Sequence, residues 1–145
     1  MIYTEWTKKA LKLCYCAHRD QVDKSGLPYV FHPFHLAEQM PDENTTIAAL
    51  LHDVAEDTAC TVEDIAAMGF PKAVTDALRL LTHDDALPYL DYVARLKQNS
   101  IARTVKLADL RHNSAEPNAK RIHIIFAFLF FFYTRKPPNG WYRSA

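Results

Sequence analysis

The stretch TTIAALLHDVAEDT, residues 45–58, begins with apolar residues and ends with charged ones, and its spacing predicts a single helix. The apolar half predicts a buried helix. Four ionisable side chains then follow within six residues: His52, Asp53, Glu56 and Asp57. Because residues four apart share a helix face, His52 lies beside Glu56 and Asp53 beside Asp57. Buried charge is costly unless it is paired or bound to a metal. The stretch therefore indicates either a solvated helix end or a metal-binding surface.

Composition limits the class of protein. The chain has 145 residues, enough for one domain with its own core, and its apolar fraction of 49% is ordinary. Its formal net charge is zero, so we expect neither nucleic acid nor a membrane surface as a partner. The N-terminus lacks the residue order of a signal peptide, and residues 124–133, the longest apolar run, reach only about half of a membrane span. Three cysteines, an odd number, favour reduced thiols in the cytoplasm.

The pattern of breakers and caps predicts an all-α fold. Glycine is scarce, and apolar residues recur at helical spacing. Asp42 can cap the helix that holds the opening stretch, and Thr61 with Asp64 resembles a capping box. We expect one domain over residues 1–134, followed by a loose tail, residues 135–145. The expected helices are 4–22, 33–40, 43–56, 61–69, 71–81, 87–98, 100–114 and 120–133.

Two further residues favour the metal interpretation of the opening stretch. His32 lies in YVFHPFHLA and Asp109 lies in TVKLADLRHN, each among apolar side chains. Taken singly, His32 is more often a hydrogen-bonded core histidine, and Asp109 can pair with Lys106 or Arg111. Taken with His52 and Asp53, they supply two imidazoles and two carboxylates, which suit a divalent first-row metal and leave coordination positions open.

Three blocks of the sequence resemble one known family. The order H…HD…D is the signature of the HD superfamily of metal-dependent phosphohydrolases. The block AHRDQVDKSGLPYVFHPFHLA, residues 17–37, is similar to the RelA/SpoT-type pattern AHxGQxRKSGxPYxxHPxxVA. The blocks AALLHDVAEDT and VKLADLRHN resemble the patterns AALLHDxxEDT and xKLADRLHN of the same family. The resemblance identifies the chain as a single-domain (p)ppGpp 3′-pyrophosphohydrolase and implies an HD-domain helical bundle.

The resemblance also implies roles for individual residues. A divalent ion, usually Mn²⁺, would be held by His32, His52, Asp53 and Asp109. Glu56 and Asp57 match the catalytic pair that positions and activates the attacking water. The guanosine nucleotide substrate would be contacted by Lys24, Ser25 and Asn113.

Some residues depart from the family pattern. Asp23 stands where the family has an arginine, Asp20 replaces a glycine, and Leu110 replaces another arginine. An arginine at position 23 would stack on a base or pair with phosphate, whereas an aspartate repels phosphate. Two other hypotheses therefore stay open. One is an HD phosphatase acting on NADPH or a nucleoside monophosphate, and the other is a catalytically weak module that binds nucleotide.

Several other residues have two interpretations each. His18 is either a buried helix histidine or a group near the phosphate, and Tyr29 either packs the loop or stacks on a base. His35 and His112 are expected beside the metal ligands or at the surface. Residues 82–85 are expected to form a solvated helix cap. Residues 124–133 are aromatic and uncharged, so they indicate a homodimer surface or an altered reading frame at the end of the gene.

Overall fold

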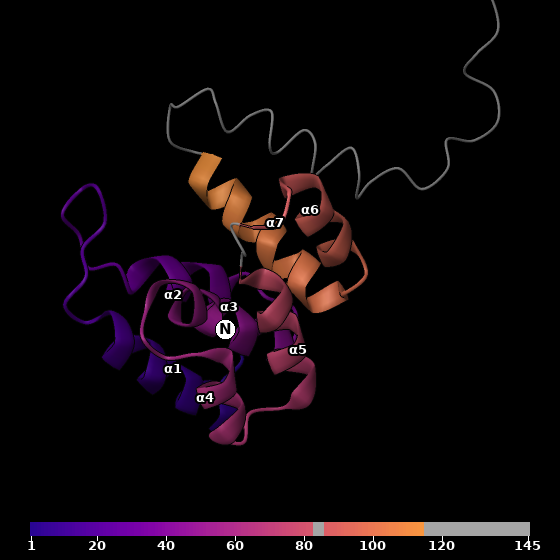
Figure 1. The fold of residues 1–145 in the computed structure, drawn as a ribbon. Coiled ribbons are helices and arrows are strands. Elements are labelled where there is room, and N and C mark those ends of the chain that lie inside the picture. Colours follow the sequence, from indigo (N-terminus) through magenta and orange to yellow (C-terminus); the bar gives the residue numbers. More distant parts are fainter. Residues whose placement is uncertain (83–85, 115–145) are drawn as a thin grey trace, which may run out of the picture.

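The computed structural model describes residues 1–82 and 86–114 of the chain. Within these ranges the protein is helical (Figure 1), and one isolated antiparallel bridge joins Val22 to Pro28. The helices are α1 (Glu5–His18), α2 (Phe31–Glu38), α3 (Glu43–Asp57), α4 (Val62–Ala67), α5 (Lys72–Leu81), α6 (Tyr89–Lys97) and α7 (Ser100–Ser114).

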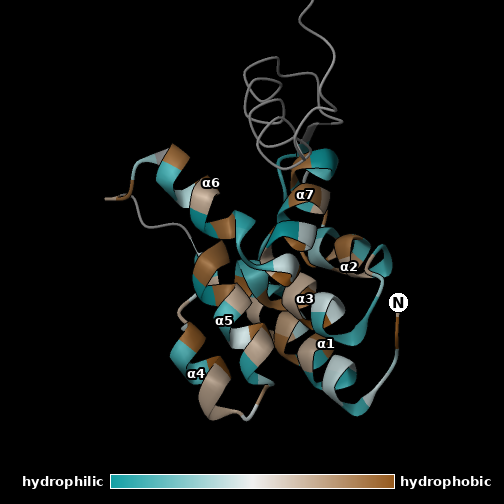
Figure 2. Ribbon diagram, turned by 90° about the vertical axis from the view of Figure 1, so that its right-hand side faces the viewer, coloured by the Kyte–Doolittle hydropathy of each residue, from teal (hydrophilic) through white to brown (hydrophobic). Residues whose placement is uncertain are grey.

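Helix α3 forms the centre of the bundle. It packs against α1, α2, α5 and α7, and Figure 2 shows it enclosed by its neighbours. Every residue from Thr45 to Val54 is buried, which confirms the predicted buried helix. Ile47, Leu50 and Leu51 are fully buried, and each contributes roughly 1.5–3 kcal/mol by leaving water. Because α3 is covered on several sides, the backbone at its end is anchored to the core.

Local capping explains where the helices begin. Asp42 accepts a hydrogen bond from the backbone N–H of Thr45, 2.9 Å away, and so begins α3 as predicted. Thr61 and Asp64 form the expected capping box at the start of α4. An unexpected third capping box, between Thr4 and Thr7, begins α1. Helix α4 is followed by Gly69, whose φ of +83° suits glycine.

The largest difference from the predicted helix boundaries is at the end of α1, and the other boundaries of α1 to α7 lie within two residues of their predicted positions. Helix α1 ends at His18, four residues before the expected position 22, because the chain turns into a short paired loop. In that loop the N–H of Tyr29 donates to the carbonyl of Gln21 at 2.9 Å. Helix α2 begins at Phe31, so Pro33 lies in its first turn, as expected. The expected helix 120–133, the tail 135–145 and most of the cap 82–85 lie outside the described residues.

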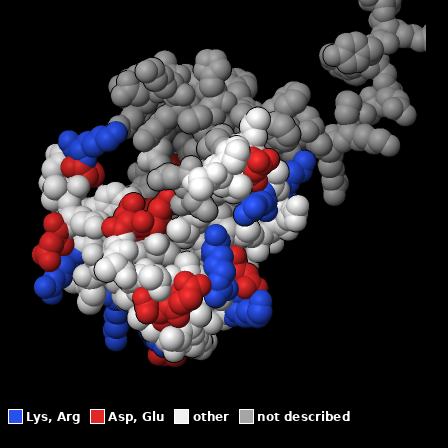
Figure 3. All heavy atoms as spheres, in the orientation of Figure 1, with Lys and Arg blue, Asp and Glu red and all other residues white. Residues whose placement is uncertain are grey.

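The surface carries charges of both signs. Figure 3 shows Asp and Glu interspersed with Lys and Arg over the face in view, as the zero net charge leads one to expect. None of the helices described has the length and apolar character needed to cross a membrane. Cys14, Cys16 and Cys60 are all free thiols, and Cys14 is buried between α1 and the core.

Candidate metal centre and active site

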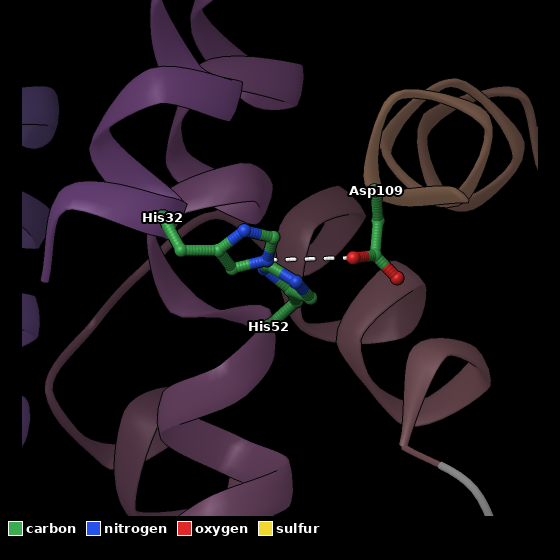
Figure 4. A group of neighbouring side chains, drawn as sticks. All are labelled: His32, His52 and Asp109. Carbon is green, nitrogen blue, oxygen red and sulfur yellow. Dashed lines mark ion pairs between the residues drawn. The ribbon is translucent and has the colours of Figure 1, made fainter. Parts of the chain in front are cut away.

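Three helices bring a group of potential metal ligands together. His32 lies in the first turn of α2, His52 near the end of α3, and Asp109 on α7. One ligand atom from each lies within 4.8 Å of the others, and Figure 4 shows the three side chains converging. His32 Nε2 lies 3.4 Å from Asp109 Oδ1. The sequence had predicted all three as ligands, although 77 residues separate His32 from Asp109 (109 − 32 = 77).

The tautomer of His52 suits a metal ligand. Its Nδ1–H donates to the carbonyl of Ala49 at 2.8 Å, so Nε2 is the ring nitrogen that would bind a metal. Nε2 is buried and has no hydrogen-bond partner in the described part of the chain. Asp53 Oδ1 approaches it to 2.9 Å, but without hydrogen-bond geometry. Because a buried polar atom is costly to leave unpaired, this nitrogen and its neighbours fit a divalent cation.

Asp53, the fourth predicted ligand, lies against the two histidines. Its Oδ2 is 3.5 Å from His32 Nε2 and accepts a 2.8 Å hydrogen bond from the Tyr29 hydroxyl. Burial alone would raise the pKa of Asp53, but its contacts with His52, His32 and the Tyr29 hydroxyl together outweigh that effect, so the pKa is lowered. Asp53 is thus a carboxylate at the edge of the group formed by His32, His52 and Asp109, with which it does not share the 4.8 Å limit.

Asp109 is held as a carboxylate from two sides. Lys106 donates to Oδ2 at 2.9 Å, and the Asn113 amide donates to Oδ1 at 2.6 Å. Burial would raise the pKa of Asp109, yet the contacts with His32 and Lys106 lower it strongly. The sequence had offered pairing with Lys106 and a metal role as alternatives, and the geometry accommodates both. A carboxylate fixed in this way is pre-oriented towards the two histidines.

Glu56 and Asp57 end α3 on the side of the metal group. Both side chains are exposed, and neither makes a hydrogen bond or ion pair with another described residue. Partial burial of each carboxylate, followed by the nearby charge of Asp53, raises the pKa of both. They are therefore unpartnered acids beside a candidate metal centre, with pKa values shifted towards neutrality, as a general base requires.

A cavity of about 370 Å³ opens beside the metal group. One wall belongs to the loop between α1 and α2, and the other to α2 and α7. Of the predicted substrate contacts, Lys24 and Asn113 line this cavity, whereas Ser25 does not. Ser25 lies in the loop, where its backbone N–H donates to Asp23. Among the described residues, the cavity is lined by Val22, Asp23, Lys24, Tyr29, His32, His112 and Asn113.

Known proteins resemble this chain in sequence and in fold. No family model matches the chain. The bifunctional (p)ppGpp synthase/hydrolase SpoT of Escherichia coli (strain K12) is 34% identical over 125 residues, covering 72% of this chain and 18% of SpoT. A guanosine-3′,5′-bis(diphosphate) 3′-pyrophosphohydrolase of Danio rerio is 32% identical over 114 residues, covering 70% of this chain and 63% of the relative.

A solved structure agrees with these relatives. It is that of a metazoan ortholog of SpoT that hydrolyses ppGpp, with a TM-score of 0.68 and 25% sequence identity. The match covers 91% of this chain and 85% of the solved one. The chain belongs to this HD-domain family. The expected all-α HD-domain bundle is thereby confirmed. The matched part of this chain covers only 18% of the length of SpoT.

Two residues of the HD domain make contacts at the site that the sequence did not predict. Tyr29 was expected to pack the loop or stack on a base, but its hydroxyl also holds Asp53. Its ring packs between the rings of His18 and His32, with distances of 5.2 Å and 5.7 Å between ring centroids. Lys106 was considered only as a neutralising partner. Burial alone would lower the pKa of Lys106, but its contact with Asp109 and smaller effects of Tyr92 and Glu56 raise it. The apolar residues that flank Tyr29 and Lys106 in the sequence do not indicate polar contacts between helices.

The remaining histidines lie close to the metal group. His18 is fully buried, and its Nδ1 lies 2.7 Å from Oε1 of Gln21. The ring of His112 lies 4.8 Å from that of His32 and 4.9 Å from that of His35, between centroids. His35 and His112, expected either beside the metal ligands or at the surface, are both exposed.

Proposed function

We propose that this HD domain is a hydrolase that removes the 3′-pyrophosphate from (p)ppGpp, giving GDP or GTP and pyrophosphate. The observation that carries the proposal is the group of His32, His52 and Asp109, which opens on a cavity lined by Lys24. The relatives from Escherichia coli and Danio rerio are named for this substrate. The cofactor we propose is Mn²⁺, held by these three residues together with Asp53, with another divalent ion able to replace it.

Each part of the reaction has a residue suited to it. When bound to His32, His52, Asp53 and Asp109, a divalent ion would supply Lewis-acid chemistry, by lowering the pKa of a water and offsetting phosphate charge. Glu56 and Asp57 orient the attacking water and take its proton, since their carboxylates are free and their pKa values raised. The water oxygen bonds to the phosphorus next to the sugar, and the bond from that phosphorus to the nucleoside 3′-oxygen breaks. Lys24 neutralises phosphate oxygens as a point charge.

The cellular setting follows from the same features. Three free cysteines suit a reducing compartment, so we place the enzyme in the cytoplasm.

The proposal also includes the domain organisation, with the domain over residues 1–134 and the tail over residues 135–145. A homodimer through residues 124–133 is also proposed, from sequence alone.

The test is product analysis with purified protein and Mn²⁺. We expect ppGpp to yield GDP and pyrophosphate, and Asp53→Ala to lose both metal and hydrolysis. NADPH and nucleoside monophosphates serve as competing substrates. Release of orthophosphate from NADPH, with ppGpp left intact, would replace the proposed substrate by the first alternative. Tight nucleotide binding with no turnover of any of them would favour the catalytically weak module.

A further inference from the structure

The loop between α1 and α2 is organised by one oxygen of Asp23. Oδ1 accepts hydrogen bonds from the backbone N–H of Ser25, at 2.8 Å, and of Leu27, at 2.9 Å. The N–H of Asp23 donates to the carbonyl of Leu27 at 2.8 Å, and Gly26 turns the chain with a φ of +80°. Its carboxylate group is therefore fixed in the loop through Oδ1.

The second oxygen of Asp23 is available to a ligand. Oδ2 makes no hydrogen bond within the residues that the structure describes, and Asp23 is exposed and lines the cavity beside Lys24 and Tyr29. A carboxylate only accepts hydrogen bonds and repels phosphate. The part of a nucleotide that reaches Asp23 must therefore be uncharged and must carry donors.

The base fits this requirement better than the sugar. In (p)ppGpp the 3′ and 5′ oxygens carry phosphates, so the ribose keeps only its 2′-hydroxyl as a donor, close to two charged groups. Guanine offers two adjacent donors, N1–H and the N2 amino group. Adenine has a lone pair at N1, which a carboxylate repels.

We propose that Oδ2 of Asp23 accepts hydrogen bonds from N1–H and the N2 amino group of guanine and so selects guanine over adenine. This inference rests on the proposed function, because it takes the substrate to be a guanosine nucleotide. Asp23 then does a different task from the arginine of the family pattern. It gives up a positive charge near the phosphates and gains a direct contact with the edge of the base.

The substitution that isolates Oδ2 is Asp23→Asn. Asparagine keeps the Oδ1 acceptor for Ser25 and Leu27 and so preserves the loop, but it replaces Oδ2 with an N–H₂ donor. The measurement is the ratio of kcat/KM for ppGpp to that for the adenosine analogue with the same two diphosphates. We expect this ratio to fall by about 10- to 100-fold, the worth of a hydrogen bond to a charged group. An unchanged ratio would overturn the proposal.

Asp20→Asn is the matched control. Asp20 is exposed, pairs with Arg19 at 3.2 Å and does not line the cavity, so the same chemical change should leave the ratio intact. Circular dichroism of both variants checks that the loop substitution has not unfolded the domain. An equal fall of the ratio in both variants would assign the effect to net charge and would contradict a direct contact.

A second measurement separates this inference from the proposed function. If the unaltered protein hydrolyses neither diphosphate substrate, the proposed function fails, and calorimetric binding of GMP and AMP still tests Asp23. A preference for GMP that disappears in Asp23→Asn supports the contact. Equal affinities of the unaltered protein for GMP and AMP would refute it, whatever reaction the site catalyses.

Discussion

Tyr29 links the cavity wall to the candidate metal centre through a single hydroxyl. It donates to Asp53 Oδ2, and the pKa of the phenol is raised, first by burial and then by the charge of Asp53. The phenol therefore stays protonated at neutral pH and can donate to the Asp53 carboxylate. Such a contact orients a ligand without touching the metal itself.

Removing that hydroxyl should weaken metal binding. For Tyr29→Phe we expect Mn²⁺ affinity to fall by about 10- to 100-fold, because Asp53 loses the bond that orients it. The ring stays, so packing against His18 and His32 is retained. Electron paramagnetic resonance of free Mn²⁺ measures the affinity directly. Tyr15→Phe, at an exposed tyrosine of α1, is the control, and an equal affinity of all three proteins would contradict the role assigned to Tyr29.

Glu56 should act in turnover and not in metal binding. Glu56→Gln should keep Mn²⁺ affinity and lower kcat by about 10²- to 10⁴-fold, the contribution of a general base. Glu63→Gln, on α4 where Glu63 pairs with Arg79, is the control. Loss of metal equal to that of Asp53→Ala would show that Glu56 is a ligand.

The same residue predicts a pH dependence. Burial raises the pKa of Glu56, and a base works only when deprotonated, so activity should fall as the pH drops through a value above the ordinary range for glutamate. This acid limb should be absent from the residual activity of Glu56→Gln. A limb at the same pH in both proteins would assign it to another group, with Asp57 the next candidate.

At the scale of elements, α3 joins the core to the site. Its first turn is anchored by Asp42 and its middle is buried, while its last two turns carry His52, Asp53, Glu56 and Asp57. Helices α2 and α7 pack on it and add His32 and Asp109. Stability and chemistry therefore use different segments of one helix, so they can be changed separately.

Loss of the α3 cap tests this separation. Asp42→Ala removes the acceptor for the N–H of Thr45 and should lower the free energy of unfolding by about 1 kcal/mol. Asp42→Asn keeps an acceptor and should cost much less. Metal affinity should be unchanged in both, since the ligands lie near the other end of the helix. Denaturant unfolding and Mn²⁺ titration measure the two quantities, and a drop in metal affinity with Asp42→Ala would link the cap to the site.

Sequence periodicity was sufficient to predict the helices but not the contacts between them. Apolar spacing and capping residues indicated α3 and its neighbours, because both signals are local. The end of α1 was placed too late, because pairing of Tyr29 with Gln21 depends on residues eight apart in a loop. His32, His52 and Asp109 were identified as ligands from their apolar sequence neighbours and from the family resemblance. The bond from Tyr29 to Asp53 joins residues 24 apart, and no local pattern records it.

At the scale of the whole molecule, residues 124–133 call for a test in the complete chain. They carry no charge and ten apolar or aromatic side chains, and they lie outside the described residues. A helix apolar on all sides must be covered, so we expect a homodimer. Light scattering should give the mass of a dimer for the full chain and of a monomer, or a less soluble protein, after removal of residues 122–145. A stable, soluble full-length monomer would rule out the dimer.

Metal binding should stabilise the bundle as a whole. The candidate ligands come from α2, α3 and α7, so one ion would join three helices that meet only through packing and a few polar contacts. Binding to the folded state alone adds about 2.7 kcal/mol when the free metal is at 100 times its Kd. Mn²⁺ should therefore raise the thermal midpoint of the metal-free protein, and chelation should reverse the rise. His52→Ala should abolish the shift, because its Nε2 is a buried nitrogen of the group without a hydrogen-bond partner among the described residues. His35→Ala, at an exposed histidine outside the group, should preserve it. An equal shift in His52→Ala would mean that Mn²⁺ binds elsewhere, and the three-helix centre would lose its role.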